Sequence, residues 1–480
     1  MKKKLISLFT MCVISGLTYA QQQCSDLNTD FNCFTIVVGK DLTVDGSIMF
    51  SHNEDDTGEQ FLNWYIVDRE THALDDKFSF YRGGSIQQAP VTNKYLWLEL
   101  PKMEVSDTYL NEHGVAIGSN GCPSKEDVED YTDGGILFEL RRILAERATS
   151  ASHAVDLIGQ LVEKYGYADT GRSYTVADKD EAWIVSVMRG RRWVAARIPS
   201  DAIMVIPNNY VIDKIDMDDT ENFRGSKDLV SYAIERGWYN PEEDGEFSFK
   251  KAYTKPGSYT HPDNIRRKWG ALYKLTGEKY PFNQDSLPFL VKPNRKIALE
   301  DLFEIHSYHF EETEQFHRIK KPDFKGHCPG ICHDGTQYCS IAHLRDGMPT
   351  EIGALMWIAP YHPCSKVFIP WYSGMTKVPE GLSRYDSAQE ALDKHMSDIT
   401  DFRKNSPNHR YWRYVDSTEA INDDYEANIL DYRKYKAKLQ KEIMKSQKKF
   451  EAKALKVTDK DELAEMLNAY TQKWIDREEF

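Results

Sequence analysis

The chain has 480 residues and a formal net charge of −14, from 61 basic and 75 acidic side chains. This acidic balance argues against a nucleic-acid partner, because phosphate binding requires a basic face. Length alone would allow two to four domains, although a large αβ sandwich can exceed that expectation.

The first twenty residues have the pattern of a signal peptide. Lys2–Lys4 form a basic region, Leu5–Gly16 an apolar core, and Thr18–Ala20 a small-residue cleavage site. That core is too short to cross a bilayer, and no later segment approaches ~18 apolar residues, so no membrane span is expected. Residues 21–32 are short and polar, as in a removable propeptide that ends at Asn32. The sequence therefore predicts a periplasmic or secreted protein.

A β-hairpin is predicted directly after this polar segment. A β-branched run follows Cys33, a turn contains Asp45-Gly46, and a second run ends in Glu54-Asp55. If the chain were cut before Cys33, one residue would hold a thiol nucleophile and a free α-amine with a pKa near ~8. Such an amine suits a general base at neutral pH, so no neighbouring histidine is required. A buried structural cysteine is the alternative interpretation of this position alone.

The rest of the chain alternates strand-like and helix-like stretches. Strands are predicted at 61–67, 95–100 and before Asn120, and amphipathic helices around 136–144 and 155–165, the second closed by Gly166. Four further runs joined by tight turns predict an antiparallel meander at 174–177, 182–188, 193–197 and 203–206. Helices are expected at 226–236 and 265–275, strands at 355–359 and 366–371, and a mostly helical tail from 387 onward. Residues 426–454 are Lys/Glu-rich, which predicts a solvated helix or helical pair against the flank of the fold.

The hairpin motif resembles the start of the mature chain in the N-terminal-nucleophile (Ntn) cysteine dipeptidases, the family that includes the secernins. The motif consists of Cys33, Val38-Gly39-Lys40, Asp45-Gly46-Ser47 and Glu54-Asp55. The resemblance extends over roughly residues 33–375, and bile-salt and penicillin acylases are more distantly similar. It implies an α+β fold, the four-layer αββα Ntn-hydrolase sandwich, over residues 33–385 with a helical C-terminal extension over 386–480. It also implies hydrolysis of small peptides, most simply dipeptides, without a metal or organic cofactor.

The same resemblance implies roles for the residues of the hairpin. Cys33 is the expected nucleophile, and Asp55 is expected to orient its α-amine. His52 stands where an arginine is commoner in the acylases and is a candidate for substrate binding.

Further site residues are implied beyond the hairpin. Asn120 corresponds to an oxyanion donor, and Asn208 and Asn209 to a second asparagine site. Arg267 corresponds to an arginine that polarises the nucleophile or binds substrate.

Two other functions remain open from the sequence. One is an acylase that cleaves N-acyl amides of the bile-salt or penicillin type. The other is a non-catalytic binding protein stabilised by zinc or disulfides, which a cysteine- and histidine-rich stretch suggests. That stretch holds His327, Cys328, Cys332, His333, Cys339 and His343. With Cys122 and Cys364, the cysteines after Cys33 number five, which allows at most two disulfides, and a disulfide-pinned substrate loop is the simplest expectation. A homo-oligomer is compatible with the sequence.

Overall fold

The computed structural model describes residues 33–56, 60–103, 107–310, 312–313 and 330–478. The predicted signal peptide and propeptide therefore lie outside the described residues, as do His327 and Cys328. None of the helices in these described ranges is long and apolar enough to cross a bilayer.

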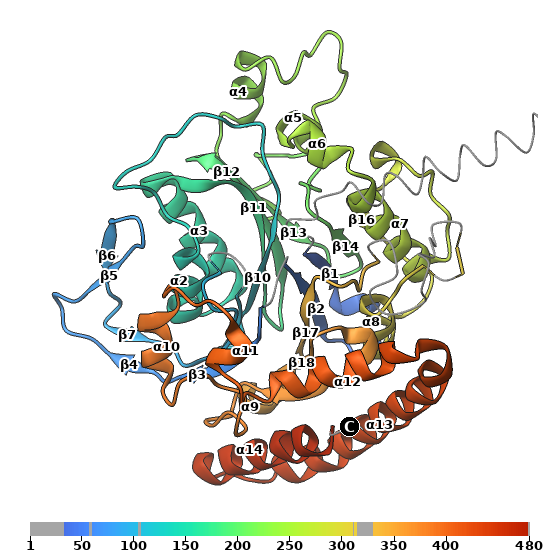
Figure 1. Cartoon of the computed structure of the whole chain (residues 1–480). Coiled ribbons are helices and arrows are strands. Elements are labelled where there is room, and N and C mark those ends of the chain that lie inside the picture. Colours follow the sequence, from blue (N-terminus) through green and yellow to red (C-terminus); the bar gives the residue numbers. More distant parts are fainter. Residues whose placement is uncertain (1–32, 57–59, 104–106, 311, 314–329, 479–480) are drawn as a thin grey trace, which may run out of the picture.

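Two antiparallel sheets form the centre of the molecule (Figure 1). The first sheet has seven strands in the order β16 (Leu290–Val291), β14 (Ile203–Ile206), β1 (Phe34–Val38), β2 (Ile48–Asp55), β17 (Thr336–Leu344), β18 (Ala354–Pro360) and β19 (Ile369–Tyr372). The second has eight strands in the order β15 (Phe223–Gly225), β13 (Trp193–Ile198), β12 (Ala182–Gly190), β11 (Tyr167–Ala177), β10 (Ala116–Gly121), β9 (Thr108–Asn111), β8 (Tyr95–Glu99) and β3 (Asn63–Val67). Two small ribbons pair β4 (Glu70–Thr71) with β7 (Val91–Thr92) and β5 (Lys77–Ser79) with β6 (Ser85–Gln87).

The two sheets pack face to face. The Tyr338 hydroxyl of the first sheet donates to Thr108 Oγ1 of the second at 2.9 Å. The ring of Phe50 fills the space beside Gly118, where an added Cβ would lie 2.9 Å from Phe50 Cζ. Gly118 therefore permits the close approach of the two sheets that Phe50 requires.

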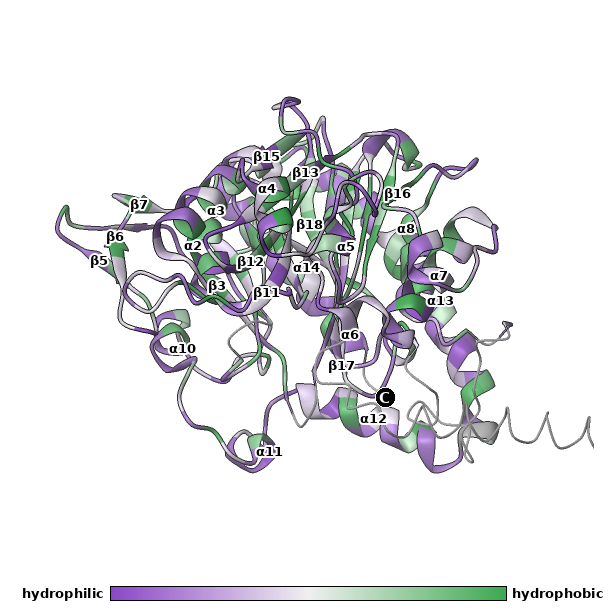
Figure 2. Ribbon diagram, turned by 90° about the horizontal axis from the view of Figure 1, so that it is seen from above, coloured by the Kyte–Doolittle hydropathy of each residue, from purple (hydrophilic) through white to green (hydrophobic). Residues whose placement is uncertain are grey.

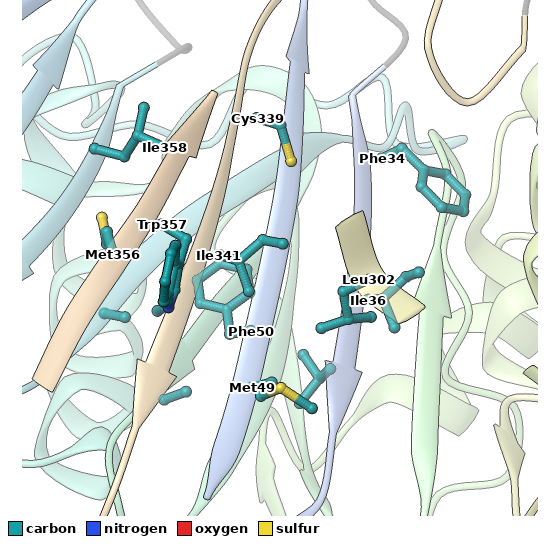
Figure 3. Packing of buried hydrophobic residues seen from close by; sticks show 14 of the residues in the cluster. Phe34, Ile36, Met49, Phe50, Leu302, Cys339, Ile341, Met356, Trp357 and Ile358 are labelled. Atoms are coloured by element: carbon teal, nitrogen blue, oxygen red, sulfur yellow. The ribbon is translucent and has the colours of Figure 1, made fainter. Parts of the chain in front are cut away.

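Helices cover both outer faces. On the eight-stranded sheet lie α2 (Glu139–Arg147) and α3 (Ala151–Tyr165). On the seven-stranded sheet lie α7 (Pro262–Thr276), α8 (Leu299–His306) and α14 (Lys460–Arg477). Figure 3 shows Leu302 of α8 next to Ile36 of β1, in a cluster that also includes apolar side chains of β2, β17 and β18. These four layers confirm the predicted αββα sandwich.

The remaining helices lie in the connections and the C-terminal region. They are η1 (Lys40–Leu42), α4 (Leu229–Glu235), α5 (Phe249–Tyr253), α6 (Pro256–Tyr259), η2 (Gln284–Ser286), α9 (Thr350–Gly353), η3 (Pro363–Ser365), α10 (Ala388–Lys394), α11 (Phe402–Asn405), α12 (Tyr411–Asp423) and α13 (Tyr425–Ala454). Polar and apolar residues alternate along α13 (Figure 2), and its Leu439 and Ile443 are buried. Residues 426–454 therefore form the first of the two predicted alternatives, one helix against the flank, with α13 packed on α14 and α14 packed on β19.

The predicted four-strand meander is wrong in its last strand. β11, β12 and β13 pair in sequence, as expected. β14, however, crosses to the first sheet and pairs with β1, with Thr35 opposite Ile206. All four of its residues are apolar, so the hydrophobic pattern is compatible with either sheet. The sequence alone could therefore not assign this strand to one of them. This crossing brings the chain after Ile206 to the N-terminal end of β1.

Replacing Gly159 of α3 by alanine should destabilise the fold. An added Cβ would lie 2.2 Å from Cζ2 of Trp193, whose indole N–H donates to Glu163 Oε1 at 2.8 Å and holds the ring in place. Overpacking costs about 1–3 kcal/mol, which should exceed the ~1 kcal/mol that alanine contributes in a helix. Thermal melting should show a lower Tm than in Gly257→Ala, where nothing lies within 4 Å of the added methyl group. Equal melting temperatures would contradict this packing.

Candidate active site

Cys33 lies immediately before β1 and is buried. Side chains alternate across a strand, so Cys33 and Thr35 point to one face and Phe34 to the other. Thr35 contacts Asn120 of β10, so this face points toward the second sheet. The Cys33 Sγ donates to Glu54 Oε1 at 3.1 Å on the neighbouring strand β2.

A chain of hydrogen bonds leads from this thiol to the second sheet. Glu54 Oε2 lies 3.0 Å from His52 Nε2, and His52 Nδ1 lies 2.7 Å from Thr35 Oγ1. The Thr35 hydroxyl donates to Asn120 Oδ1 at 2.7 Å. A hydroxyl has one proton to donate, so Nδ1 of His52 must carry the hydrogen in its contact with Thr35. Nε2 of His52 faces Glu54 Oε2, so the thiol, the carboxylate, the imidazole, the hydroxyl and the amide form one connected chain.

Asp55 lies on the opposite face of β2. Its Oδ1 accepts from the Thr336 hydroxyl at 2.5 Å, and its Oδ2 lies 3.3 Å from His333 Nε2 and 3.9 Å from Arg267 Nη1. The same Arg267 Nη1 donates to the backbone oxygen of Cys33 at 3.2 Å. Asp55 and the Cys33 carbonyl thus share a neighbour in Arg267, which places the carboxylate in the vicinity of Cys33.

His333 provides Asp55 with a cationic neighbour. Burial alone would lower the pKa of His333, but the carboxylates of Asp55 and Asp334 raise it to about 9. The imidazole is therefore protonated at neutral pH. It was expected from the sequence only as a member of a zinc set.

Arg267 of α7 is fully buried and joins several site residues. Its Nη2 donates to Asn208 Oδ1 at 2.8 Å and to Asn264 Oδ1 at 2.9 Å. The amide nitrogen of Asn208 donates to the Gly121 carbonyl at 3.0 Å. The crossing of β14 makes this cluster possible, since it places Asn208 next to β10 and near Cys33.

The three predicted asparagines differ in their available donors. Asn120 Nδ2 donates to the backbone oxygens of Ile206 at 3.3 Å and Pro207 at 3.4 Å. Asn208 also uses its amide nitrogen, as described above. Asn209 is fully buried, and neither amide atom has a hydrogen-bond partner within the described ranges. Of the three asparagines, Asn209 is the one whose side-chain amide has no hydrogen-bond partner among the described residues.

The thiol of Cys33 is protonated at neutral pH. Burial, together with the carboxylates of Glu54 and Asp55, raises its pKa well above the ordinary value, although Arg172 opposes the rise. To act as a nucleophile, such a thiol would need a base that removes its proton. Neither Glu54 nor Arg172 was predicted as a partner of the thiol. The sequence does not identify Arg172 as a site residue, because an arginine within a strand is typical of a solvent-facing position.

Thr35→Val should weaken the fold, because it removes the hydroxyl that joins His52 to Asn120. The amide oxygen of Asn120 would remain buried without its donor, at a cost of about 1–3 kcal/mol. Thr175→Val is the matched control, because Thr175 is fully buried on β11 and its hydroxyl has no partner in the described part of the chain. Urea unfolding should show a clear loss of stability for Thr35→Val and little or none for Thr175→Val. Similar losses in both variants would mean that the Thr35 hydroxyl contributes nothing specific.

The described members of the alternative zinc set do not come together. His343 Nε2 lies 2.7 Å from Asp45 Oδ2, and His333 faces Asp55. Cys339 lies on β17, and Cys332 lies elsewhere, in the loop before that strand. The described cysteines, Cys33, Cys122, Cys332, Cys339 and Cys364, are all free, so the expected disulfides are not found among them.

Comparison with known proteins gives a consistent set of relatives. A sequence model of peptidase family C69 matches residues 124–424. A probable dipeptidase of Latilactobacillus sakei is 27% identical over 369 residues, covering 72% of this chain and 75% of the relative. Dipeptidase A of Lactobacillus helveticus is 27% identical over 371 residues, covering 72% and 76%. A probable dipeptidase B of Streptococcus pyogenes is 23% identical over 402 residues, covering 79% and 78%.

Solved structures with similarity to the chain include two acylases. Penicillin V acylase from Agrobacterium tumefaciens has a TM-score of 0.37 and 12% identity, with 74% of this chain and 89% of that chain covered. A conjugated bile acid hydrolase from Clostridium perfringens has a TM-score of 0.32 and 13% identity, with 71% and 96% covered. The C69 match begins at residue 124, after Cys33, Asp55 and Asn120. Roles for these three residues therefore depend on where their side chains lie and not on the family match.

Proposed function

Because the chain belongs to peptidase family C69, we propose that it hydrolyses dipeptides through Cys33, acting as an N-terminal nucleophile after residues 1–32 are removed. The observation that carries this proposal is the position of Cys33 at the head of a central strand, with Arg267 in contact with both its carbonyl and Asp55. The dipeptidase relatives support the substrate class.

The reaction begins with transfer of the thiol proton to the α-amine of Cys33, which Asp55 orients. The thiolate attacks the scissile carbonyl carbon, and the resulting oxyanion accepts from fixed donors, for which the side-chain amides of Asn120 and Asn209 are the candidates. The intermediate collapses to a thioester as the α-ammonium protonates the leaving amine. Water, deprotonated by the same amine, then releases the acid and restores the thiol.

Substrate choice separates this proposal from the acylase alternative. A panel of unmodified dipeptides and their N-acetylated forms should be tested with the purified mature protein. We expect hydrolysis of the unmodified dipeptides and at most weak hydrolysis of the acetylated forms. Preference for N-acyl amides with long apolar acyl chains would instead assign the protein to the acylase group.

The proposed location is the periplasm or the exterior of the cell, because residues 1–20 have the pattern of a signal peptide. Fractionation of the native host cells should therefore find the activity outside the cytoplasm. Activity confined to the cytoplasmic fraction would contradict this location.

Maturation is expected at the bond between Asn32 and Cys33. Intact-mass measurement of the active protein should give a chain that begins at Cys33, since only then does the α-amine base exist. N-terminal sequencing provides an independent check. A fully active protein that still begins at Gln21 would exclude the N-terminal-nucleophile mechanism.

A further inference from the structure

A second cluster of reactive side chains lies apart from Cys33. It consists of His309, Cys332 and Cys364, and one potential ligand atom from each lies within 4.8 Å of the others. The three residues come from separate segments: the chain just after α8, the loop before β17, and η3. His309 and Cys332 are buried, and Cys364 is partly exposed. Folding has therefore gathered two sulfurs and one imidazole from distant positions.

The ligand types and spacing suit zinc. Tetrahedral zinc binds thiolates at about 2.3 Å and imidazole nitrogen at about 2.0–2.1 Å, so its ligand atoms lie roughly 3.5–3.8 Å apart. The potential ligand atoms of the cluster all lie within 4.8 Å of one another, so a small contraction brings them to that geometry. A disulfide between Cys332 and Cys364 would use the two sulfurs alone, whereas a zinc ion would be held by both sulfurs and by His309.

A fourth position is accessible at this cluster. Cys364 borders a cavity of about 950 Å³ between α8 and α13, which is also lined by Phe303, Tyr308, Phe368 and Met444. Water can therefore reach the sulfur from the cavity side and complete a tetrahedral shell.

We propose that His309, Cys332 and Cys364 bind one zinc ion, with the fourth ligand supplied from the cavity. The two thiolates balance the charge of the ion, and binding releases thiol protons to solvent. The ion joins the end of α8, η3 and the loop before β17. Cys332 directly precedes His333, which lies beside Asp55, so the ion also fixes the loop that supports the candidate active site. This zinc site is separate from the proposed peptidase reaction.

The test uses the full chain, purified under reducing conditions, incubated with zinc and dialysed. Elemental analysis should find one zinc ion per chain, and replacement by cobalt should give thiolate-to-cobalt charge-transfer absorption. Cys364→Ser and His309→Asn should each lose the stoichiometric zinc and this absorption. Cys339→Ala should keep both, because Cys339 is a buried cysteine outside the cluster. Chelation should lower the Tm of the wild type but not of Cys364→Ser.

Cys33→Ala is a second control, because Cys33, His52 and Glu54 also lie within 4.8 Å of one another. It should retain its zinc. Loss of the ion in Cys33→Ala would move the site to the hairpin and overturn the proposal. Cobalt binding to the wild type without thiolate charge-transfer absorption would also overturn the proposal. This measurement does not depend on the folding of any variant. A wild-type chain without zinc, in which peptide mapping finds Cys332 bonded to Cys364, would overturn it as well.

Discussion

Cys33→Ala should abolish dipeptide hydrolysis and leave residues 21–32 attached if maturation is autocatalytic. The variant lacks the only sulfur at the head of β1, and loss of a catalytic nucleophile lowers turnover by about 10⁶-fold. The fold should persist, because alanine fits where the buried thiol stood. Hydrolysis and intact mass are the two measurements, with thermal melting as a check of folding.

Cys33→Ser and Cys339→Ala complete this experiment. A hydroxyl is a weaker nucleophile than a thiol, so Cys33→Ser should hydrolyse amides poorly even where some maturation remains. Cys339→Ala removes another buried cysteine of the same sheet and should keep its activity. Normal hydrolysis by Cys33→Ala would place the active site elsewhere.

Asp55→Asn should lower turnover by up to about 10²–10⁴-fold, which is the usual contribution of a general base, because Asp55 orients the α-amine that acts as the base. The amide keeps the size of the side chain but removes the charge that holds the α-ammonium and α-amine of Cys33. Turnover should be measured on chains whose intact mass begins at Cys33, so that a maturation defect is not counted as a catalytic one. A change of only a few-fold would remove Asp55 from the proposed mechanism.

Asp334→Asn is the matched control for Asp55→Asn. Asp334 lies 3.6 Å from His333 Nδ1, so it shares the His333 contact with Asp55. Within the part of the chain that the structure describes, Asp334 has no hydrogen bond with the backbone of Cys33. If Asp55 acts on the α-amine, Asp334→Asn should retain most of the activity. Equal losses in the two variants would show that Asp55 acts through His333 alone.

The local part of the fold could be predicted from the sequence. The hairpin around Asp45-Gly46 was correct, because turn residues and β-branched runs act over a few positions. Helix α3 was also correct, and its caps are Ser150, which accepts from the His153 backbone, and Gly166. These signals depend on neighbours in sequence, so they can be interpreted without the tertiary structure.

Long-range pairing could not be predicted in the same way. The apolar residues of β14 fit either sheet, and only the crossing places Asn208 against Arg267. Arg172 and Glu54 act on the thiol through contacts that the sequence does not encode locally. The zinc alternative from the sequence contained only residues close together along the chain. In the proposed site, by contrast, His309 and Cys364 lie far from Cys332 in the sequence.

The position of β1 inside its sheet has a consequence for the order of biosynthetic events. β1 is flanked by β14, and its partner β2 is flanked by β17, so Thr35 pairs with Ile206 and His52 with Ser340. Both pairings join segments that are far apart in the sequence. Such long-range pairings form slowly and late in folding. The thiol of Cys33 therefore reaches its final surroundings only after the chain has been synthesised to about β17. Autocatalytic removal of residues 21–32 would then occur only in chains in which β1 has paired with β14 and β2 with β17. A chain that begins at Cys33 would therefore be a chain that has folded correctly.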